Sequence, residues 1–361
     1  MQRIDSAFKI IGAMMQKYNT IVFILRGQPV HKAHIAIINK ASKMALRVVV
    51  IIGSAHQPRS YKNPFTANER GLMISESTRH LDNINIEYNT DSIYNDSAWI
   101  VRVQQIVDTY RTSSYVYDNQ QENIGIIGHE KDHSSWYIKA FPQWDIIRVD
   151  DIVEELDATS IRDLYFREDF GPDNTYIKSV VTPEVYTFLL DFAETKEYKQ
   201  IINERKYVAG YKKQYEHLQY SPVFVTSDAV VVQSGHILMI KRKSEPGKGL
   251  WALPGGFLNA DTDKSVLDCA IRELKEETKI KVPVPVLKGS IVDSKVFDAI
   301  ERSTRGRTIT HAFYILLPEG ELPTVKGSDD ALVAKWIPIG QLDRSLCFED
   351  HYSIIEHFIG G

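Results

Sequence analysis

The chain has 361 residues, which is long for one hydrophobic core, so two domains are the default expectation. It is 43% hydrophobic and 25% charged, as in an ordinary globular protein, and has no low-complexity tract or internal repeat. Because 43 Lys and Arg nearly balance 47 Asp and Glu, and no long basic stretch occurs, we expect no binding to nucleic acid through phosphate neutralisation.

The two cysteines, Cys269 and Cys347, are typical of reduced cytosolic thiols rather than of a disulfide framework. Lys9 and Gly12 interrupt the short apolar stretch at 8–15, so the N-terminus lacks the layout of a signal peptide. No uninterrupted apolar segment is long enough to span a bilayer. We therefore expect a cytoplasmic protein that does not bind membranes, while the sequence leaves its oligomeric state open.

The first half of the chain has the pattern of an α/β domain. Residues 21–25 and 47–52 are continuous apolar runs, as expected of strands buried on both faces. Residues 31–46, between them, carry apolar side chains at helical spacing, so the three segments predict a β–α–β unit. Another apolar run at 124–127 ends at Gly128 and predicts a later strand. We expect a Rossmann-like open parallel sheet whose ligands bind at the carboxyl ends of its strands.

The first predicted strand leads into two histidines, His31 and His34, at the start of the predicted helix. Imidazoles three positions apart share a helix face and lie beside backbone N–H groups that favour anions. They suit donation of hydrogen bonds to a polyphosphate whose charge grows in the transition state. Two surface histidines on an amphipathic helix are the alternative, which their position directly after the first strand disfavours.

The HKAH motif at 31–34 resembles the HxGH nucleotidyltransferase superfamily, with Ala33 at the usual glycine. The superfamily's second signature, [ST]xxR at a helix start, is matched by Thr159, Ser160 and Arg162. The resemblance assigns to Arg162 the β- and γ-phosphates of ATP, for which a two-pronged guanidinium is suited. Taken alone, this second motif would only indicate a capped helix.

Residues 52–55 and the NPFTANER string at 63–70 resemble the nicotinamide-mononucleotide adenylyltransferases of the archaeal type. The resemblance implies that Trp99 lies near the nicotinamide ring; an ordinary core tryptophan is the alternative. The substrate-binding residues that it implies in this half are Gly27, Gln28, Gly53, Ser54, Asn63, Phe65, Arg70, Trp99, Gly128, Lys131, Asp132, Thr159 and Ser160.

The HEKDH string at 129–133 fits the zinc-protease motif HExxH. That motif must lie on a helix and find a third ligand, whereas this copy follows a predicted strand and a glycine. We therefore expect no zinc here. The resemblance instead places Lys131 and Asp132 at the nucleotide site, with Lys131 as a phosphate ligand.

From about residue 191 to 219 the sequence becomes highly charged and rich in tyrosine, which predicts a helical connector. Strands resume at 223–232 and 236–241, and a third is predicted at 251–257. A helix and more strands follow, as far as Trp336. We expect an adenylyltransferase domain at 1–190, the connector at 191–219, and an α/β/α domain at 220–361.

The most specific string in the chain is a Gly-Gly-Phe strand end at 255–257 followed by RELKEE at 272–277. On a helix, Glu273, Glu276 and Glu277 share one face, while the opposite face is apolar. Clustered carboxylates repel one another unless a cation is present, and oxygen ligands suit Mg²⁺ or Mn²⁺. A solvated acidic face is the alternative, which the preceding glycines disfavour.

This pattern resembles the Nudix box, with departures in the loop before the helix. Arg272 lies two residues farther from the glycines than in the box. The position of the upstream Glu then falls on Lys264, and that of the late Gly falls on Lys279. Because the REUxEE part is intact, we expect metal-dependent hydrolysis to survive, with Asp261 or Asp263 in place of the missing Glu.

A cationic loop at 302–307 leads into another predicted strand. Arginines there suit a diphosphate, although a solvated basic loop would have the same sequence. With the preceding aromatic residue, the loop resembles ADP-ribose-recognising Nudix domains, which implies substrate contacts by Phe297, Arg302, Arg305 and Arg307. The sequence leaves the general base open among Glu319, Glu321, Glu349, Asp350 and His351.

Nearly the whole chain thus resembles the bacterial bifunctional nicotinamide-mononucleotide adenylyltransferase/ADP-ribose pyrophosphatase family. The resemblance implies that the phosphate of nicotinamide mononucleotide attacks the α-phosphorus of ATP, giving NAD and pyrophosphate. It also implies that metal-activated water cleaves ADP-ribose to AMP and ribose 5-phosphate.

Two alternatives stay open. The C-terminal domain could be a non-catalytic module that senses NAD or ADP-ribose, which Lys264 and Lys279 keep open and the intact carboxylates oppose. The N-terminal domain could transfer the adenylyl group to another acceptor, such as pantetheine phosphate or flavin mononucleotide. The string at 63–70 and Trp99 argue against this alternative.

Overall fold

The computed structural model describes residues 17–111, 122–129, 133–149, 156–167, 170–171, 174–328 and 331–360, without the side chains of 133–135. The chain divides into two compact units, with the boundary between Lys199 and Gln200. This boundary falls inside helix α9 (Lys196–Lys213), so one helix takes part in both units. None of the helices in the described part of the chain is long and apolar enough to cross a membrane.

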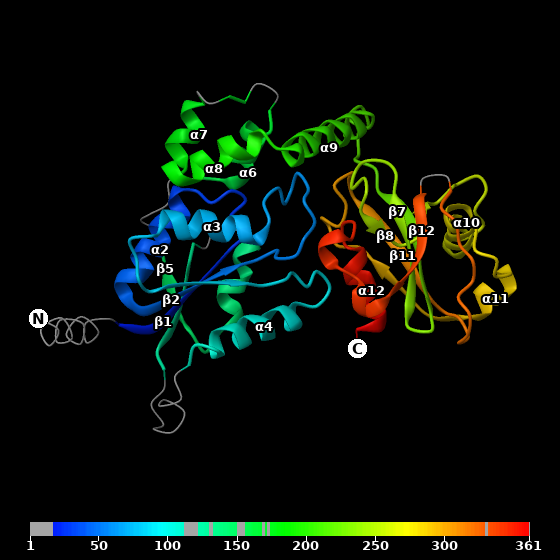
Figure 1. Cartoon of the computed structure of the whole chain (residues 1–361), viewed down its shortest axis with the longest axis horizontal. Coiled ribbons are helices and arrows are strands. Elements are labelled where there is room, and N and C mark those ends of the chain that lie inside the picture. Colours follow the sequence, from blue (N-terminus) through cyan, green and yellow to red (C-terminus); the bar gives the residue numbers. More distant parts are fainter. Residues whose placement is uncertain are drawn as a thin grey trace, which may run out of the picture. The chain divides into compact units, whose positions relative to one another are not determined.

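The first unit is built on a five-stranded sheet in which all the strands are parallel and the order is β3-β2-β1-β4-β5 (Figure 1). The strands are β1 (Tyr18–Leu25), β2 (Ala45–Ile52), β3 (Ile84–Tyr88), β4 (Ile124–Gly128) and β5 (Asp145–Arg148). The apolar runs that predicted β1 and β2 are buried, because helices cover both faces. The strand order reverses between β1 and β4, and in such sheets the ligand crevice opens there, at the carboxyl ends.

The helices of this unit pack on the sheet and on one another. They are α2 (Lys32–Met44), α3 (Ala67–Ser77), α4 (Asp96–Asp108), the 3-10 helix η1 (His133–Ala140), α6 (Ala158–Tyr165), α7 (Thr175–Val180) and α8 (Pro183–Ala193). Val103 and Val107 of α4 join a core with Val22 and Ile24 of β1. A second, aromatic core brings Tyr165 into contact with helices α8 and α9, and so holds α6 near the sheet.

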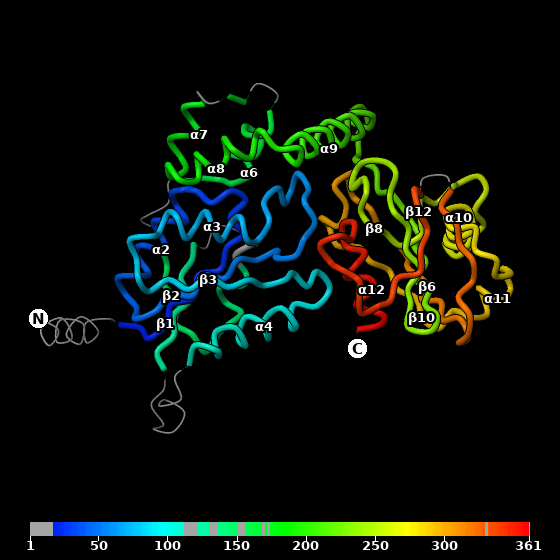
Figure 2. Tube along the Cα trace, in the orientation of Figure 1, coloured from blue at the N-terminus to red at the C-terminus, as the bar shows by residue number. Residues whose placement is uncertain are grey.

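The second unit contains a mixed sheet with the order β10-β11-β6-β7-β12, in which the short strand β8 pairs with β7 and the short strand β9 pairs with β6. Figure 2 labels β6, β8, β10 and β12 of this sheet along the Cα trace. Only the pairing of β6 with β11 is parallel among the strand pairs of the described residues. The strands are β6 (Phe224–Gln233), β7 (His236–Arg242), β8 (Trp251–Ala252), β9 (Gly255–Phe257), β10 (Ile291–Phe297), β11 (Thr308–Leu316) and β12 (Ala331–Pro338).

Helices on opposite faces of this sheet complete an α/β/α sandwich (Figure 1). The apolar face of α10 buries Ile271 and Leu274 in a core with Leu238 and Trp336. On the other face, the aromatic ring of Phe358 packs against the sheet. The helical elements are α10 (Val266–Thr278), α11 (Val284–Gly289), α12 (His351–Ile359) and the 3-10 turns η2 (Ile339–Gln341) and η3 (Arg344–Leu346).

One predicted strand, at 251–257, is in fact two. The chain pairs first with β7 as β8 and then with β6 as β9, and it crosses between them at Leu253 and Pro254. Proline has no N–H for a ladder, so pairing is interrupted at this point. The crossing matters for function because it brings the glycines at 255 and 256 to the lining of a cavity in the second unit.

Candidate active sites

The first candidate site lies where β1 ends and α2 begins. His31 is the N-cap residue of α2, and its backbone N–H donates to Nδ1 of His34 at 3.2 Å. The two imidazole rings are stacked with their centroids 3.7 Å apart. Burial, and next the neighbouring His31, lower the pKa of His34 well below its usual value, so this imidazole is neutral at neutral pH. Since its Nδ1 accepts a hydrogen bond, its proton lies on Nε2, from which it can donate to a ligand.

Arg162 reaches this loop from α6, although the two motifs are far apart in the sequence. Its Nη1 donates to the carbonyl of Gln28 at 2.8 Å, and its Nη2 donates to the hydroxyl of Thr159 at 3.1 Å. Its Nε is buried and has no hydrogen-bond partner among the described residues. Partial burial lowers the pKa of Arg162, but a guanidinium remains charged, so a half-buried cation with an unused donor lies beside the histidine loop.

The N-cap of α6 is Asp157, whose carboxylate accepts from both the N–H and the hydroxyl of Ser160. The motif at 159–162, whose sequence is TSIR, therefore does not cap its own helix. Asp157 anchors the start of α6, and Thr159 then supports the guanidinium of Arg162.

Gln28 and Phe65 tie the NPFT segment to the histidine loop. The amide of Gln28 donates to the carbonyl of Phe65 at 2.9 Å and accepts from its N–H at 3.0 Å. The ring of Phe65 is fully buried and packs edge-on against Phe192 at 5.1 Å. Asn63 is part of a turn with Ser60, whose hydroxyl accepts from the Asn63 N–H. We expected Gln28 and Phe65 to touch substrate, but these groups mainly hold two loops together.

Arg70, also expected to bind substrate, has a different task in the structure. Its side chain is 1% exposed, and its guanidinium donates to the carbonyls of Arg26, Gly53 and Ser54 at 2.6 to 3.1 Å. These carbonyls follow β1 and β2. Arg70 therefore fixes the carboxyl ends of two neighbouring strands relative to each other.

Asp91 belongs to the same edge of the sheet, and our sequence analysis missed it. Its two carboxylate oxygens accept from the N–H and the hydroxyl of Ser54, at 3.1 and 2.6 Å. Ser54 needs this support because its backbone is in the left-handed region, at φ 50°. The one signal that could have found Asp91 is its position just after β3.

Trp99 lies on α4 within an aromatic cluster. Its ring centroid is 5.7 Å from that of Trp136 and 6.2 Å from that of Phe141, and it packs against the core of the first unit. Trp136 is 45% exposed, so this cluster reaches the surface. The ring of Trp99 is thus part of the core edge and is only partly buried, and its place near a nicotinamide ring stays a prediction.

Gly128, at the end of β4, lies under the side chain of Ile138. An added Cβ would be 2.9 Å from Cδ1 of that isoleucine, so a larger residue here would require the end of the Ile138 side chain to shift. Lys131 and Asp132, the other predicted nucleotide ligands of this region, fall outside the described residues.

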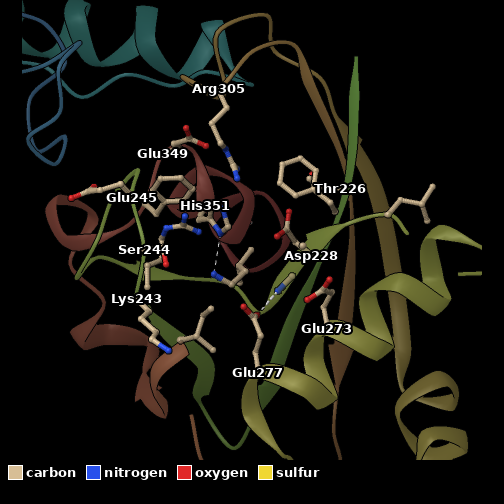
Figure 3. A pocket seen from close by; sticks show the side chains of 18 of the residues that line it. Thr226, Asp228, Lys243, Ser244, Glu245, Glu273, Glu277, Arg305, Glu349 and His351 are labelled. Carbon is tan, nitrogen blue, oxygen red and sulfur yellow. Dashed lines mark hydrogen bonds between the residues drawn. The ribbon is translucent and has the colours of Figure 1, made fainter. Parts of the chain in front are cut away.

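The second candidate site is a cavity of about 550 Å³ in the second unit (Figure 3). Glu273 and Glu277 point into it from α10, and Arg305 and Glu349 lie across it. Asp228 of β6, which our sequence analysis missed, also lines it. No sequence motif singles out this aspartate, which lies in an otherwise apolar strand.

The two glycines of β9 let the chain pass between these carboxylates. A Cβ on Gly255 would be 2.4 Å from Oδ1 of Asp228, and a Cβ on Gly256 would be 2.5 Å from Oε1 of Glu273. The N–H of Gly255 donates to Glu277 at 2.9 Å. Burial, together with the nearby Glu273 and Asp228, raises the pKa of Glu277 to about 8. Three oxygen-donor side chains that disfavour one another's charge are a chemically suitable set for a hard divalent cation.

Glu276 does not join this set. Arg272 donates to Glu276 at 3.0 Å, to Glu273 at 2.8 Å, and to both oxygens of Asp263 at 2.8 Å. Glu276 is half exposed and is absent from the cavity lining. We expected three glutamates at the metal; the structure points two of them into the cavity and leaves the third exposed beside Arg272. No group of three His, Cys, Asp or Glu in the described residues already has metal-binding geometry.

The two substituted positions of the Nudix box, Lys264 and Lys279, lie outside the cavity lining, whereas Leu258 and Asn259 of the longer loop before α10 belong to it. Asp263 is the acidic partner of Arg272, and this hydrogen bonding lowers the pKa of Asp263 to about 2. Lys279 is the C-cap of α10 in a left-handed conformation at φ 48°, where glycine is favoured. A side chain there costs about 1 kcal/mol and leaves the helix in place. Lys264 is exposed in the loop before α10.

The four residues expected to bind substrate near the basic loop have different environments. Arg305 lines the cavity, with its guanidinium 5.0 Å above the ring of Phe257. Arg302 also lines it, but donates from Nε and Nη2 to Asp350 at 2.9 and 3.0 Å. Arg307 is absent from the lining. Phe297 is completely buried against α12, so our expectation that it contacts substrate is wrong.

Models of two known protein families match the two units of the chain. The cytidylyltransferase-like family matches residues 27–228, and the NUDIX domain family matches residues 223–358. The crystal structure of a bifunctional NMN adenylyltransferase/ADP ribose pyrophosphatase from Francisella tularensis, complexed with AMP and Mn ion, is 34% identical with a TM-score of 0.84. That similarity covers 95% of this chain and 99% of the other.

Single-activity relatives match each half. A nicotinamide/nicotinic acid mononucleotide adenylyltransferase from Acinetobacter baylyi is 34% identical over 196 residues, which are 54% of this chain and 96% of that protein. An ADP-ribose pyrophosphatase from Methanocaldococcus jannaschii is 36% identical over 135 residues, which are 37% of this chain and 72% of that protein.

The buried pair of Arg302 and Asp350 gives a prediction about stability. The two side chains are 3% and 0% exposed, so Arg302→Ala leaves a buried carboxylate without its main partner. We expect urea unfolding to show a loss of ~3–5 kcal/mol, the range for breaking a buried ion pair from one side. Arg305→Ala is the matched control and should cost far less. Equal effects of the two substitutions would show that Arg302 is not a structural residue.

Proposed function

The chain belongs to the family of bifunctional NMN adenylyltransferase/ADP-ribose pyrophosphatases, and from this premise we propose how its residues perform the two reactions. The first unit transfers the adenylyl group of ATP to nicotinamide mononucleotide, and the second hydrolyses ADP-ribose. The observation that carries this conclusion is that one family spans both units in the same order. The roles of individual residues rest on the geometry of each site.

In the first unit, we propose that the histidines and Arg162 stabilise charge on the phosphates of ATP. The phosphate of nicotinamide mononucleotide is itself the nucleophile, so the protein needs to supply only position and complementary charge. Neutral His34 donates from Nε2 as negative charge moves toward the departing pyrophosphate. The unused Nε of Arg162 and its fixed guanidinium suit the β- and γ-phosphates.

We propose that nicotinamide mononucleotide lies toward Trp99. Its aromatic cluster reaches the surface at Trp136 and offers ring faces to a planar base. Ser54 and Asp91, held at the carboxyl ends of the strands, line the same edge of the sheet, and the carboxylate of Asp91 suits the hydroxyl groups of a ribose.

In the second unit, we propose that Glu273 and Glu277 hold Mg²⁺ or Mn²⁺, with Asp228 nearby. Such an ion, when bound, neutralises the diphosphate and lowers the pKa of a bound water. Arg272 orients Glu273 through their 2.8 Å hydrogen bond, and Asp263 in turn holds Arg272. Arg305, which faces the cavity, suits the diphosphate or the adjoining part of the substrate.

We propose Glu349 as the general base of hydrolysis. Of the five candidates from the sequence, Glu349 and His351 line the cavity, and Asp350 is held by Arg302. His351 already accepts the N–H of Leu253 at Nδ1, and burial lowers its pKa to about 3. Burial instead raises the pKa of Glu349, which suits a group that must take a proton from water.

A non-catalytic sensing role for the second unit has less support. The lysines that kept this alternative open both lie away from the cavity lining, whereas two acidic side chains of the box point into it. The geometry therefore favours hydrolysis.

Substituting His34 tests the first site. His34→Ala should lower the turnover number of dinucleotide synthesis by ~10²–10³-fold, the usual effect of removing one donor that stabilises transition-state charge. Hydrolysis of ADP-ribose by the same preparation should be nearly intact, because the second site lies in another unit. A comparable loss of both activities in a folded protein would contradict the assignment.

The two glutamates at positions 276 and 277 provide a matched test of the metal site. Glu277→Gln should lower ADP-ribose hydrolysis and Mn²⁺ affinity by more than ~100-fold, beyond the range for residues outside the metal's own ligands. Glu276→Gln should cause a smaller loss, because that carboxylate pairs with Arg272 outside the cavity. Metal titration and ADP-ribose turnover measure both effects, with dinucleotide synthesis as a control for folding. Parental metal dependence in Glu277→Gln would exclude it as a ligand.

The assignment of the general base is tested by Glu349→Gln. The amide keeps an oxygen that can accept from the Thr304 N–H but cannot take up a proton. We expect kcat to fall by ~10²–10⁴-fold with little change in KM. Glu319→Gln, an exposed residue away from the cavity lining, is the control. If Glu349→Gln keeps the parental kcat, another group must act as the base.

A further inference from the structure

Helix α9 contributes tyrosines to the second site that neither proposed reaction explains. Tyr207 and Tyr211 lie one helical turn apart and therefore on the same side of α9. Both line the cavity that contains Glu273 and Glu277. They precede residue 223, where the match to the NUDIX family begins. Helix α9 thus adds to the cavity a wall of residues that lie outside the match to the NUDIX family.

The wall is aromatic and continues across the unit. The ring of Tyr211 is 5.8 Å from that of Phe224, and Phe224 is 5.8 Å from Phe257. Arg305 lies 5.0 Å above Phe257, and both also line the cavity. Burial and a hydrogen bond with Tyr215 raise the pKa of Tyr211 to about 12, so this ring is uncharged. The result is a set of aromatic rings beside the guanidinium of Arg305.

This wall differs chemically from the acidic side of the cavity. Figure 3 shows Arg305 across the cavity from Glu277. The acidic side suits a metal-bound diphosphate, whereas ring faces and a guanidinium suit stacking with a flat heteroaromatic base. Of the two ends of ADP-ribose, only one has such a base, and the other is a ribose with hydroxyl groups. Tyr207, at 44% exposure, is a large ring at the edge of the cavity that such a base would cover.

We propose that Tyr207 and Tyr211 of α9, together with Phe257 and Arg305, form the subsite for the purine base of the nucleotide substrate. This rests on the proposed hydrolysis of ADP-ribose in the same cavity. The two tyrosines act in substrate binding and specificity, and the carboxylates on α10 carry out the reaction. The connector helix is then a functional part of the hydrolase.

The full-length chain with Tyr211→Leu or Tyr207→Leu tests this subsite. ADP-ribose hydrolysis is measured with AMP or ribose 5-phosphate as competing inhibitor, because these molecules represent the two ends of the substrate. Loss of one stacking ring should raise the KM for ADP-ribose and the inhibition constant of AMP by ~10-fold. The inhibition constant of ribose 5-phosphate and kcat should not change. Tyr211→Phe, which keeps the ring, should resemble the parent.

Tyr220→Leu is the matched control, since this tyrosine is 78% exposed and lies off the cavity lining. The ring of Tyr211 packs on Phe224, so Tyr211→Leu could unfold. In that case Tyr207→Leu, at an exposed position, is the variant that tests the subsite. Suppose that the parent is active and that AMP inhibits Tyr207→Leu, and Tyr211→Leu if it folds, as strongly as it inhibits the parent. This result would overturn the inference about the purine subsite and leave the proposed function standing. Equal weakening of AMP and ribose 5-phosphate would also overturn it. A parent that does not hydrolyse ADP-ribose would overturn the proposed function and this inference together.

Discussion

A charged side chain taken out of water must meet complementary groups at fixed positions, and both sites of this chain depend on that constraint. In the first unit, the guanidinium of buried Arg70 donates its hydrogen bonds to backbone carbonyls, with Asp91 nearby, and so fixes where the strand ends lie. In the second unit, Asp228, Glu273 and Glu277 crowd one side of a cavity. Their carboxylates are held apart by β9, by Thr310 and by Arg272, which prepares a site that a divalent cation would complete.

The same constraint separates arginines that hold the fold from arginines that face a ligand. Arg70 and Arg302 are nearly inaccessible, and most of their guanidinium donors are used by the protein itself. Arg162 keeps an unused buried Nε, and Arg305 lies against an aromatic ring at the cavity. A guanidinium can therefore mark a site or support one, and the partners of its nitrogens decide which.

The two reactions place different demands on the protein. Adenylyl transfer needs donors at a strand end because the substrate brings its own nucleophile, and an open parallel sheet offers backbone and side-chain donors there. Hydrolysis of a diphosphate needs a cation and a base, and in our proposal α10 holds the cation and the turn before α12 supplies the base. The connector helix α9 supplies neither the cation ligands nor the base, yet its tyrosines line the hydrolytic cavity.

The sequence by itself determined the class of each unit and the location of its chemistry. Strands β1 and β2 and helices α2 and α10 follow from apolar spacing, because spacing along the chain directly reflects which faces are buried. The histidine motif, the TSIR motif and the RELKEE helix were recognisable for the same reason: their residues are close together in the chain. Tertiary structure alone decided which side chains are available to a ligand. It turned Glu276 toward Arg272, buried Phe297, paired Arg302 with Asp350, and brought Asp91, Asp228 and the tyrosines of α9 to the sites. These outcomes depend on contacts between segments that are distant in the chain, and local spacing carries no record of such contacts.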